Sequence, residues 1–236
     1  MPTLLPTELG AAREIDLALL ISDLSGYTAL TETHGALHAS EVVLHFQRLV
    51  RDSLEPGVAI INSIGDDVLC AGDGTPAVVR TALRLRDAVE REPDFPKVRT
   101  GLHRGRIVER EGQVFGAPIN LTARLAAFAN GSQILCTEAV ARAASGLDGI
   151  ETLALGEQHF RNVAYPVAVF EIYRAAERRA MAVIDPVCRM QVRIDRAVAT
   201  IVHGGTTYRF CSLDCARTFT NAPDIYGAGG AEPPAK

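Results

Sequence analysis

The apolar residues of this chain follow two patterns, continuous runs and helix-spaced stripes. Continuous runs predict buried strands at Ile15–Ile21 and Val58–Ile64. Apolar residues at helical spacing predict helices at Ala39–Leu54 and Val78–Val89. A hairpin over residues 98–108 and 113–115 is expected to lead into a further helix. Strands and helices therefore alternate through the first half of the chain.

Length and composition predict a soluble cytoplasmic protein of two domains. A chain of 236 residues exceeds the usual size of one domain, and a hydrophobic content of 47% is enough for a real core. No apolar run reaches the length of a membrane span, and Met1–Ala12 lacks the basic start and apolar stretch of a signal peptide. The net charge is −4 and the basic residues are dispersed, so neither nucleic acid nor a membrane is expected as a partner.

Two aspartates each follow an apolar run and lie beside a glycine turn. Asp23 comes before Gly26, and Asp66 follows Gly65. Magnesium is usually held by one or two carboxylates together with substrate phosphates, so this pair is suited to hold two ions against a nucleoside triphosphate. The free N–H groups at the start of the helix after Asp23, around Leu24, Ser25, Gly26 and Tyr27, suit a phosphate. The alternative is that both aspartates only cap turns, as Asp often does.

A third segment places an amide and a guanidinium on one side of a helix. Asn120 and Arg124 are four residues apart, so they are about one turn from each other. The amide suits a sugar oxygen, and the guanidinium suits a phosphoryl group through bidentate hydrogen bonds. The alternative is an ordinary solvated helix face.

Taken in order, the motifs resemble the class III adenylate/guanylate cyclase catalytic domain over residues 15–173. The segments that carry the resemblance are SDLSGYTAL, SIGDD, RTGLHRGRIV, FGAPINLTARLAAFANGSQILCTEAV and LGEQHFRNVAYPVAVFEIY. The resemblance implies a ferredoxin-like α+β domain that works as a head-to-tail homodimer with active sites at the interface. It also implies two Mg²⁺ or Mn²⁺ ions at Asp23 and Asp66 of one subunit, with Asn120 orienting the ribose and Arg124 stabilising the transition state from the other.

The residues expected to read the base depart from the family pattern. Adenine-reading cyclases use a lysine and an aspartate at positions that hold Asn62 and Gln113 here. Guanine-reading members use an acid and a small residue, and neither is present. Two amides can donate and accept hydrogen bonds, so they remain able to read a purine edge. ATP is the expected substrate, and a pyrimidine-selective cyclase is an alternative.

Three of the five cysteines lie near the C-terminus, where Cys188 is expected in a turn and Cys211 and Cys215 on one face at the start of a helix. Clustered cysteines in a protein of cytosolic character more often bind metal than form disulfides. Residues 183–226 resemble the YHS domain, a small treble-clef-like metal-binding module. Thiolates suit zinc or cuprous copper, with a fourth position left to water, His203 or a partner. The alternative is a reduced core, since free Cys packs as a modest hydrophobe.

The expected organisation is an N-terminal arm (1–14), a cyclase domain (15–173), a charged linker (174–182), a YHS domain (183–226) and a disordered tail (227–236). The predicted activity is a nucleotidyl cyclase that forms a 3′,5′-cyclic monophosphate and pyrophosphate, with metal at the YHS cysteines as a regulator. The alternative is a catalytically degenerate cyclase domain that binds a nucleotide or a partner, with metal binding as the main activity.

Overall fold

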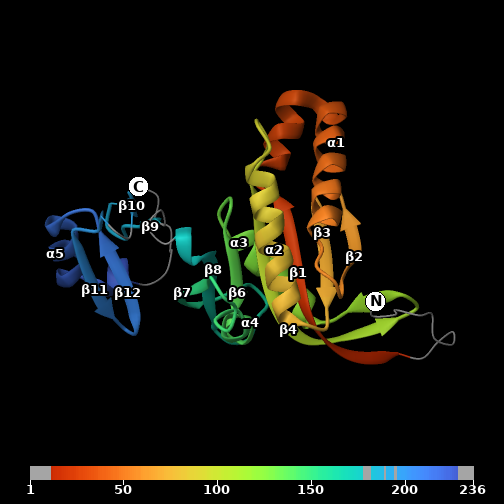
Figure 1. Ribbon diagram of the computed structural model, residues 1–236. Coiled ribbons are helices and arrows are strands. Elements are labelled where there is room, and N and C mark those ends of the chain that lie inside the picture. Colours follow the sequence, from red (N-terminus) through yellow and green to blue (C-terminus); the bar gives the residue numbers. More distant parts are fainter. Residues whose placement is uncertain (1–11, 178–181, 189, 194–195, 228–236) are drawn as a thin grey trace.

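The strands of the protein form one large sheet and two small hairpins (Figure 1). The computed structural model describes residues 12–177, 182–188, 190–193 and 196–227. The predicted tail beyond Gly227, most of the predicted arm and residues 178–181 of the predicted linker lie outside this range. The strands are β1 (Arg13–Leu24), β2 (Val58–Ile64), β3 (Asp67–Gly72), β4 (Val98–Arg110), β5 (Gln113–Phe115), β6 (Ile134–Thr137), β7 (Ile150–Gln158), β8 (Val167–Arg174), β9 (Ala182–Ile184), β10 (Gln191–Arg193), β11 (Ala199–His203) and β12 (Thr206–Phe210).

The large sheet has the strand order β2-β3-β1-β4-β6-β8-β7, with β5 paired to β4. β4 and β6 are parallel, and the other neighbouring pairs of this sheet are antiparallel. The predicted strands at Ile15–Ile21 and Val58–Ile64 and the predicted hairpin are confirmed. β1 begins at Arg13, two residues earlier than expected, because Arg13 and Glu14 pair with Glu109 and Val108 of the long β4. The α+β class predicted by the family resemblance is confirmed.

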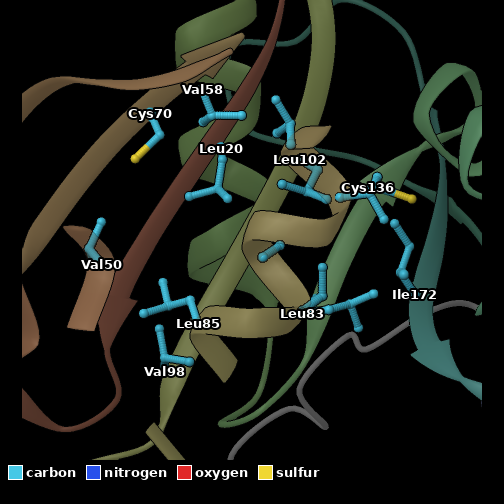
Figure 2. Close-up of a cluster of buried hydrophobic side chains, with 14 of the residues drawn as sticks. Leu20, Val50, Val58, Cys70, Leu83, Leu85, Val98, Leu102, Cys136 and Ile172 are labelled. Atoms are coloured by element: carbon cyan, nitrogen blue, oxygen red, sulfur yellow. The ribbon is translucent and has the colours of Figure 1, made fainter. Parts of the chain in front are cut away.

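Helices cover one face of the large sheet with the main hydrophobic core. The helices of the N-terminal part are α1 (Tyr27–Ser53), α2 (Thr75–Glu90), α3 (Ala117–Phe128) and α4 (Glu138–Ala144). Buried side chains from α1, α2 and α4 meet those of the sheet, and Figure 2 shows Leu20, Val50, Leu83, Leu102 and Ile172 in this cluster. α1 joins the helix expected after Asp23 to the helix expected at Ala39–Leu54, and it bends at Gly35, whose φ of 81° is not helical.

The opposite face of the sheet is only partly covered, by α3. Leu17, Leu19 and Ile107 are buried there, while Ile15 and Ile61 are half-buried. Gly101 of β4 allows α3 to approach closely, because a Cβ at this position would lie 2.4 Å from the Thr122 carbonyl oxygen and 2.5 Å from the Ala126 nitrogen. Side chains alternate between faces along a strand, so Asp23 lies on the same face as Leu17 and Leu19.

The C-terminal part consists of the hairpins β9–β10 and β11–β12 followed by α5 (Leu213–Asn221) and α6 (Pro223–Tyr226). Its small core consists of Phe210, Ala216 and Phe219, and the rings of Tyr208 and Phe219 are tilted by 39° with their centroids 4.6 Å apart. This part meets the large sheet where Thr206 of β12 lies beside Gly156 of β7. A cavity of about 690 Å³ lies at the junction, and the predicted cyclase site residues do not line it.

Candidate active site and candidate metal centre

Asp23 is held at the end of β1 by an arginine on the neighbouring strand. Arg99 of β4 is its cross-strand partner. The Arg99 Nε donates to Asp23 Oδ1 at 2.6 Å and its Nη2 donates to Oδ2 at 2.9 Å. Such a bidentate, charge-assisted pair fixes the carboxylate and uses both of its oxygens. An ion at Asp23 therefore has to compete with Arg99.

Asp66 lies in the turn between β2 and β3 and is brought to the same corner. The backbone N–H of Leu24, next to Asp23, donates to its carboxylate. Burial raises the pKa of Asp66, the Asp23 charge raises it further, and these effects outweigh the hydrogen bonds and Arg99, which lower it. Burial and the charges of Asp23 and Asp66 likewise raise the pKa of Asp67. The structure thus brings the two predicted aspartates together, and carboxylate oxygens are the ligands that a hard divalent cation prefers.

The predicted phosphate loop is only partly free. The Leu24 N–H faces Asp66, and the Ser25 N–H donates to the Lys97 carbonyl at 2.8 Å. Gly26 adopts a left-handed conformation with φ of 84°, and α1 begins at the next residue, Tyr27. The backbone N–H groups that remain for a phosphate are therefore those of Gly26, Tyr27 and the first turn of α1.

Asn120 and Arg124 share the exposed side of α3, as predicted. The buried residues of this helix are Thr122, Leu125 and Ala126, which pack on the sheet. In the described part of the chain, no hydrogen bond or ion pair joins Asn120 or Arg124 to the Asp23–Asp66 corner. A single chain therefore does not bring the four predicted catalytic and metal residues together.

The predicted base-reading residues are both exposed. Asn62 lies at a bulge of β2, and its Oδ1 accepts the Ser63 N–H at 2.8 Å. Gln113 lies on β5 opposite Arg110. Within the residues the structure describes, no contact joins Asn62 to Gln113.

The three C-terminal cysteines lie together. The Sγ atoms of Cys188 and Cys211 are 3.4 Å apart, and those of Cys211 and Cys215 are 3.7 Å apart. A tetrahedral ion with Zn–S bonds of about 2.3 Å separates its sulfur ligands by about 3.8 Å. The spacing of the thiols therefore fits one tetrahedral metal ion.

Asp185 is the fourth member of this cluster, and it was not predicted. Its ligand atom and the three sulfurs all lie within 4.8 Å of one another. The hydrogen bond to Asp185, together with those to Cys188 and Cys215, raises the pKa of the Cys211 thiol to about 12, so the free cluster retains protons that a metal ion would displace. His203, which was weighed as a ligand, is outside the cluster, and its ring packs edge-on against Phe219.

The predicted setting of these cysteines needs one correction. Cys215 lies in the first turn of α5, but Cys211 precedes the helix, directly after β12. Ser212 is the N-cap of α5, and its side chain accepts the Cys215 N–H at 3.1 Å. Because Ser212 is the N-cap, the helix begins at Leu213, two residues after Cys211.

Sequence reasoning missed Arg99 and Asp185. Arg99 is the first residue of the segment RTGLHRGRIV that resembles the cyclases, but only strand register could place it beside Asp23. Asp185 lies three residues before Cys188 within residues 183–226, but its contacts with backbone N–H groups cannot be read from the sequence.

Comparison with known proteins gives relatives for both parts. Residues 183–229 match the family model of the YHS domain. The chain is 30% identical over 173 residues to a pH-sensitive adenylate cyclase of Mycobacterium tuberculosis, a match that covers 72% of this chain and 43% of the relative. An adenylate cyclase of Streptomyces griseus is 33% identical over 122 residues, 51% of this chain and 31% of the relative. The chain thus spans less than half the length of these relatives.

Solved structures agree with this relationship. The adenylyl cyclase CyaB from P. aeruginosa has a TM-score of 0.59 at 18% identity and covers 69% of this chain and 96% of its own. An adenylate/guanylate cyclase/hydrolase from Silicibacter pomeroyi has a TM-score of 0.57 at 26% identity and covers 68% of this chain and 97% of its own.

The large sheet and its helices have the fold of a class III cyclase catalytic domain. The chain combines this cyclase domain with a C-terminal YHS domain. Among the described residues, no helix is long and apolar enough to cross a membrane.

Proposed function

We propose that this protein is a nucleotidyl cyclase that converts a nucleoside triphosphate, ATP in the first place, to the 3′,5′-cyclic monophosphate and pyrophosphate. The observation that carries the proposal is the corner where Asp23, Asp66 and Arg99 meet at the end of β1. Relatives named adenylate cyclases support ATP as the substrate.

The carboxylates of Asp23 and Asp66 would hold the divalent ions. Magnesium or manganese bound there would lower the pKa of the ribose 3′-hydroxyl and neutralise phosphate charge. Arg99 would exchange its bond to Asp23 for phosphate oxygens, because the triphosphate offers the guanidinium a new bidentate acceptor. The N–H groups at the start of α1 would bind the same phosphates.

The remaining groups would come from a second copy of the chain. Asn120 and Arg124 are exposed on α3 and separate from the Asp23 corner, and the sheet face beside α3 is only partly covered. In a head-to-tail homodimer, Asn120 of one subunit would orient the ribose bound at the other. Arg124 would stabilise the charge that develops as the 3′-oxygen attacks the α-phosphorus.

The test is product formation by the purified protein with Mn²⁺ or Mg²⁺ and each of ATP, GTP, CTP and UTP. Cyclic product from ATP, lost in Asp23→Asn and in Arg124→Ala, is the expected result. Product from another triphosphate alone would correct the substrate and would show what Asn62 and Gln113 read. No product with any triphosphate, from a verified dimer, would refute the cyclase.

The second candidate function is nucleotide or partner binding without turnover, with metal binding as the main activity. Two observations favour it: both Asp23 oxygens are taken by Arg99, and the base-reading residues Asn62 and Gln113 are exposed amides without contact to each other. Calorimetry that detects ATP binding by a protein without cyclase product would establish this candidate.

Metal at the YHS cysteines is proposed to regulate the cyclase. β12 runs from Thr206, which lies beside Gly156 of the cyclase domain, to Phe210, the residue before Cys211. A change at the cysteines can therefore reach β7 through one short strand. Removing or loading the metal should alter turnover or dimerisation, and the regulatory proposal fails if neither changes.

A further inference from the structure

Asp185 is a fully buried carboxylate between the two segments that carry the cysteines. Its Oδ1 accepts the backbone N–H groups of Val187 at 2.9 Å and Cys188 at 3.3 Å. Its Oδ2 accepts the N–H of Cys211 at 2.8 Å. The side chain is 0% exposed, so it is shielded from solvent while lying beside three thiols.

We propose that Asp185 is the fourth ligand of the metal centre, which is a closed Cys₃Asp site. This inference rests on the proposal that the three cysteines hold a metal. An ionised carboxylate has about four lone-pair sites, and three backbone N–H groups use three of them. One site remains, and the Cys211 thiol hydrogen-bonds to the same carboxylate. Asp185 and the three thiolates would together hold the ion, because their ligand atoms all lie within 4.8 Å of one another.

A closed site changes the expected metal and the expected role. Three thiolates and one carboxylate supply four negative charges, which suit a divalent ion better than cuprous copper, and a hard oxygen ligand favours zinc further. Four protein ligands are typical of structural zinc, whereas an open position is typical of a catalytic or exchanging site. The site therefore assigns Zn²⁺ a structural role that fixes the turn at Cys188 to the end of β12.

Cobalt substitution in the reduced full-length protein tests the ligand directly. Thiolate-to-cobalt absorption grows with the number of thiolates, and ions at the oxygen ligands of Asp23 and Asp66 do not contribute to it. Asp185→Cys should raise this absorption by about one third over wild type, since three thiolates become four. Cys188→Ser should lower it by about one third. Asp214→Ala, which removes a carboxylate that is 90% exposed in α5, is the matched control and should leave it unchanged.

Access of a small ligand provides a second readout that does not depend on the folding of Asp185→Cys. Imidazole should leave the wild-type cobalt spectrum unchanged and should shift that of Asp185→Ala, in which the fourth position is open. Imidazole binding to wild type, or an Asp185→Cys spectrum with the wild-type thiolate intensity, would overturn the inference and leave Asp185 as a positioning residue. Absence of cobalt binding by wild type would instead refute the metal centre itself.

Discussion

Substitution of Gly101 tests how the close approach of α3 to β4 positions the proposed catalytic residues Asn120 and Arg124. A Cβ on Gly101 would lie 2.4 Å from the Thr122 carbonyl oxygen, 2.5 Å from the Ala126 nitrogen and 2.9 Å from the Leu125 Cβ. Two of these atoms are backbone, so the clash is not relieved by a side-chain rotation. Gly101→Ala must move α3 away by about 1 Å to restore ordinary contacts.

The expected cost follows from this displacement. Overpacking of a core typically costs about 1–3 kcal/mol, and a clash with backbone places Gly101→Ala near 3 kcal/mol. A domain of this size loses about 2–4 °C of Tm for each kcal/mol, so the variant should melt roughly 6–12 °C below wild type. Because α3 carries Asn120 and Arg124, kcat should also fall while ATP still binds at the Asp23 corner.

Thermal unfolding followed by circular dichroism, together with initial-rate kinetics, measures both effects. Gly146→Ala is the matched control, because a Cβ there meets only the Ala143 carbonyl oxygen at 3.7 Å and needs no strained backbone. A Gly101→Ala variant that melts within about 1 °C of Gly146→Ala would refute the reasoning, since the predicted overpacking is several-fold larger than an ordinary surface change.

Three further predictions concern charged and thiol groups. Burial favours the neutral carboxyl group of Glu171 in the folded protein and raises its pKa to about 7. The protonated group therefore stabilises the fold fully below about pH 4.5, and this stabilisation is lost as pH rises through 7. Glu171→Gln should therefore match wild type near pH 5 and be more stable at pH 8 in urea unfolding, whereas a lower stability at pH 8 would contradict the burial argument. Arg99→Gln leaves the carboxylates at the Asp23 corner without their cation, so Mn²⁺ should raise the Tm of this variant more than that of wild type, and equal shifts would count against the carboxylate cluster as an ion site. Alkylation of the native metal-free protein should label the exposed or half-exposed Cys188, Cys211 and Cys215 and spare the buried Cys70 and Cys136. Zinc should protect the three labelled cysteines. Rapid labelling of all five would be inconsistent with the fold.

Local patterns were sufficient for strands β1 and β2, for the hairpin of β4 and β5, and for grouping the candidate metal ligands. The runs at Ile15–Ile21 and Val58–Ile64 are strands because both are rich in β-branched and aliphatic residues and end at glycine turns. The same turns bring Asp23 and Asp66 to one corner. Cys188, Cys211 and Cys215 also meet as expected, because a hairpin folds one segment against the other.

Features that depend on the register between distant segments could not be predicted. Arg99 faces Asp23 only because β1 and β4 are antiparallel neighbours with Asp23 opposite Arg99. The bend in α1 could not be predicted, because it depends on the positive φ of Gly35, which no apolar pattern displays. Asp185 escaped because its contacts are with backbone N–H groups, which no pattern of side chains displays.

The most direct test of the central claim is complementation between two inactive variants. In a composite homodimer, a site needs Asp23 from one subunit and Arg124 from the other. Mixing equal amounts of Asp23→Asn and Arg124→Ala, dissociated and reassembled together, forms heterodimers as half of all dimers. Each heterodimer carries one site with both native residues and one site that lacks both.

If each site is built from both subunits, the mixture recovers about one quarter of wild-type cyclase activity, while each variant alone stays inactive. Two results would contradict an active site built by Asp23 and Arg124 of different subunits. One is no recovery of activity from a mixture in which heterodimers are shown to form. The other is cyclase activity retained by one of the two variants alone.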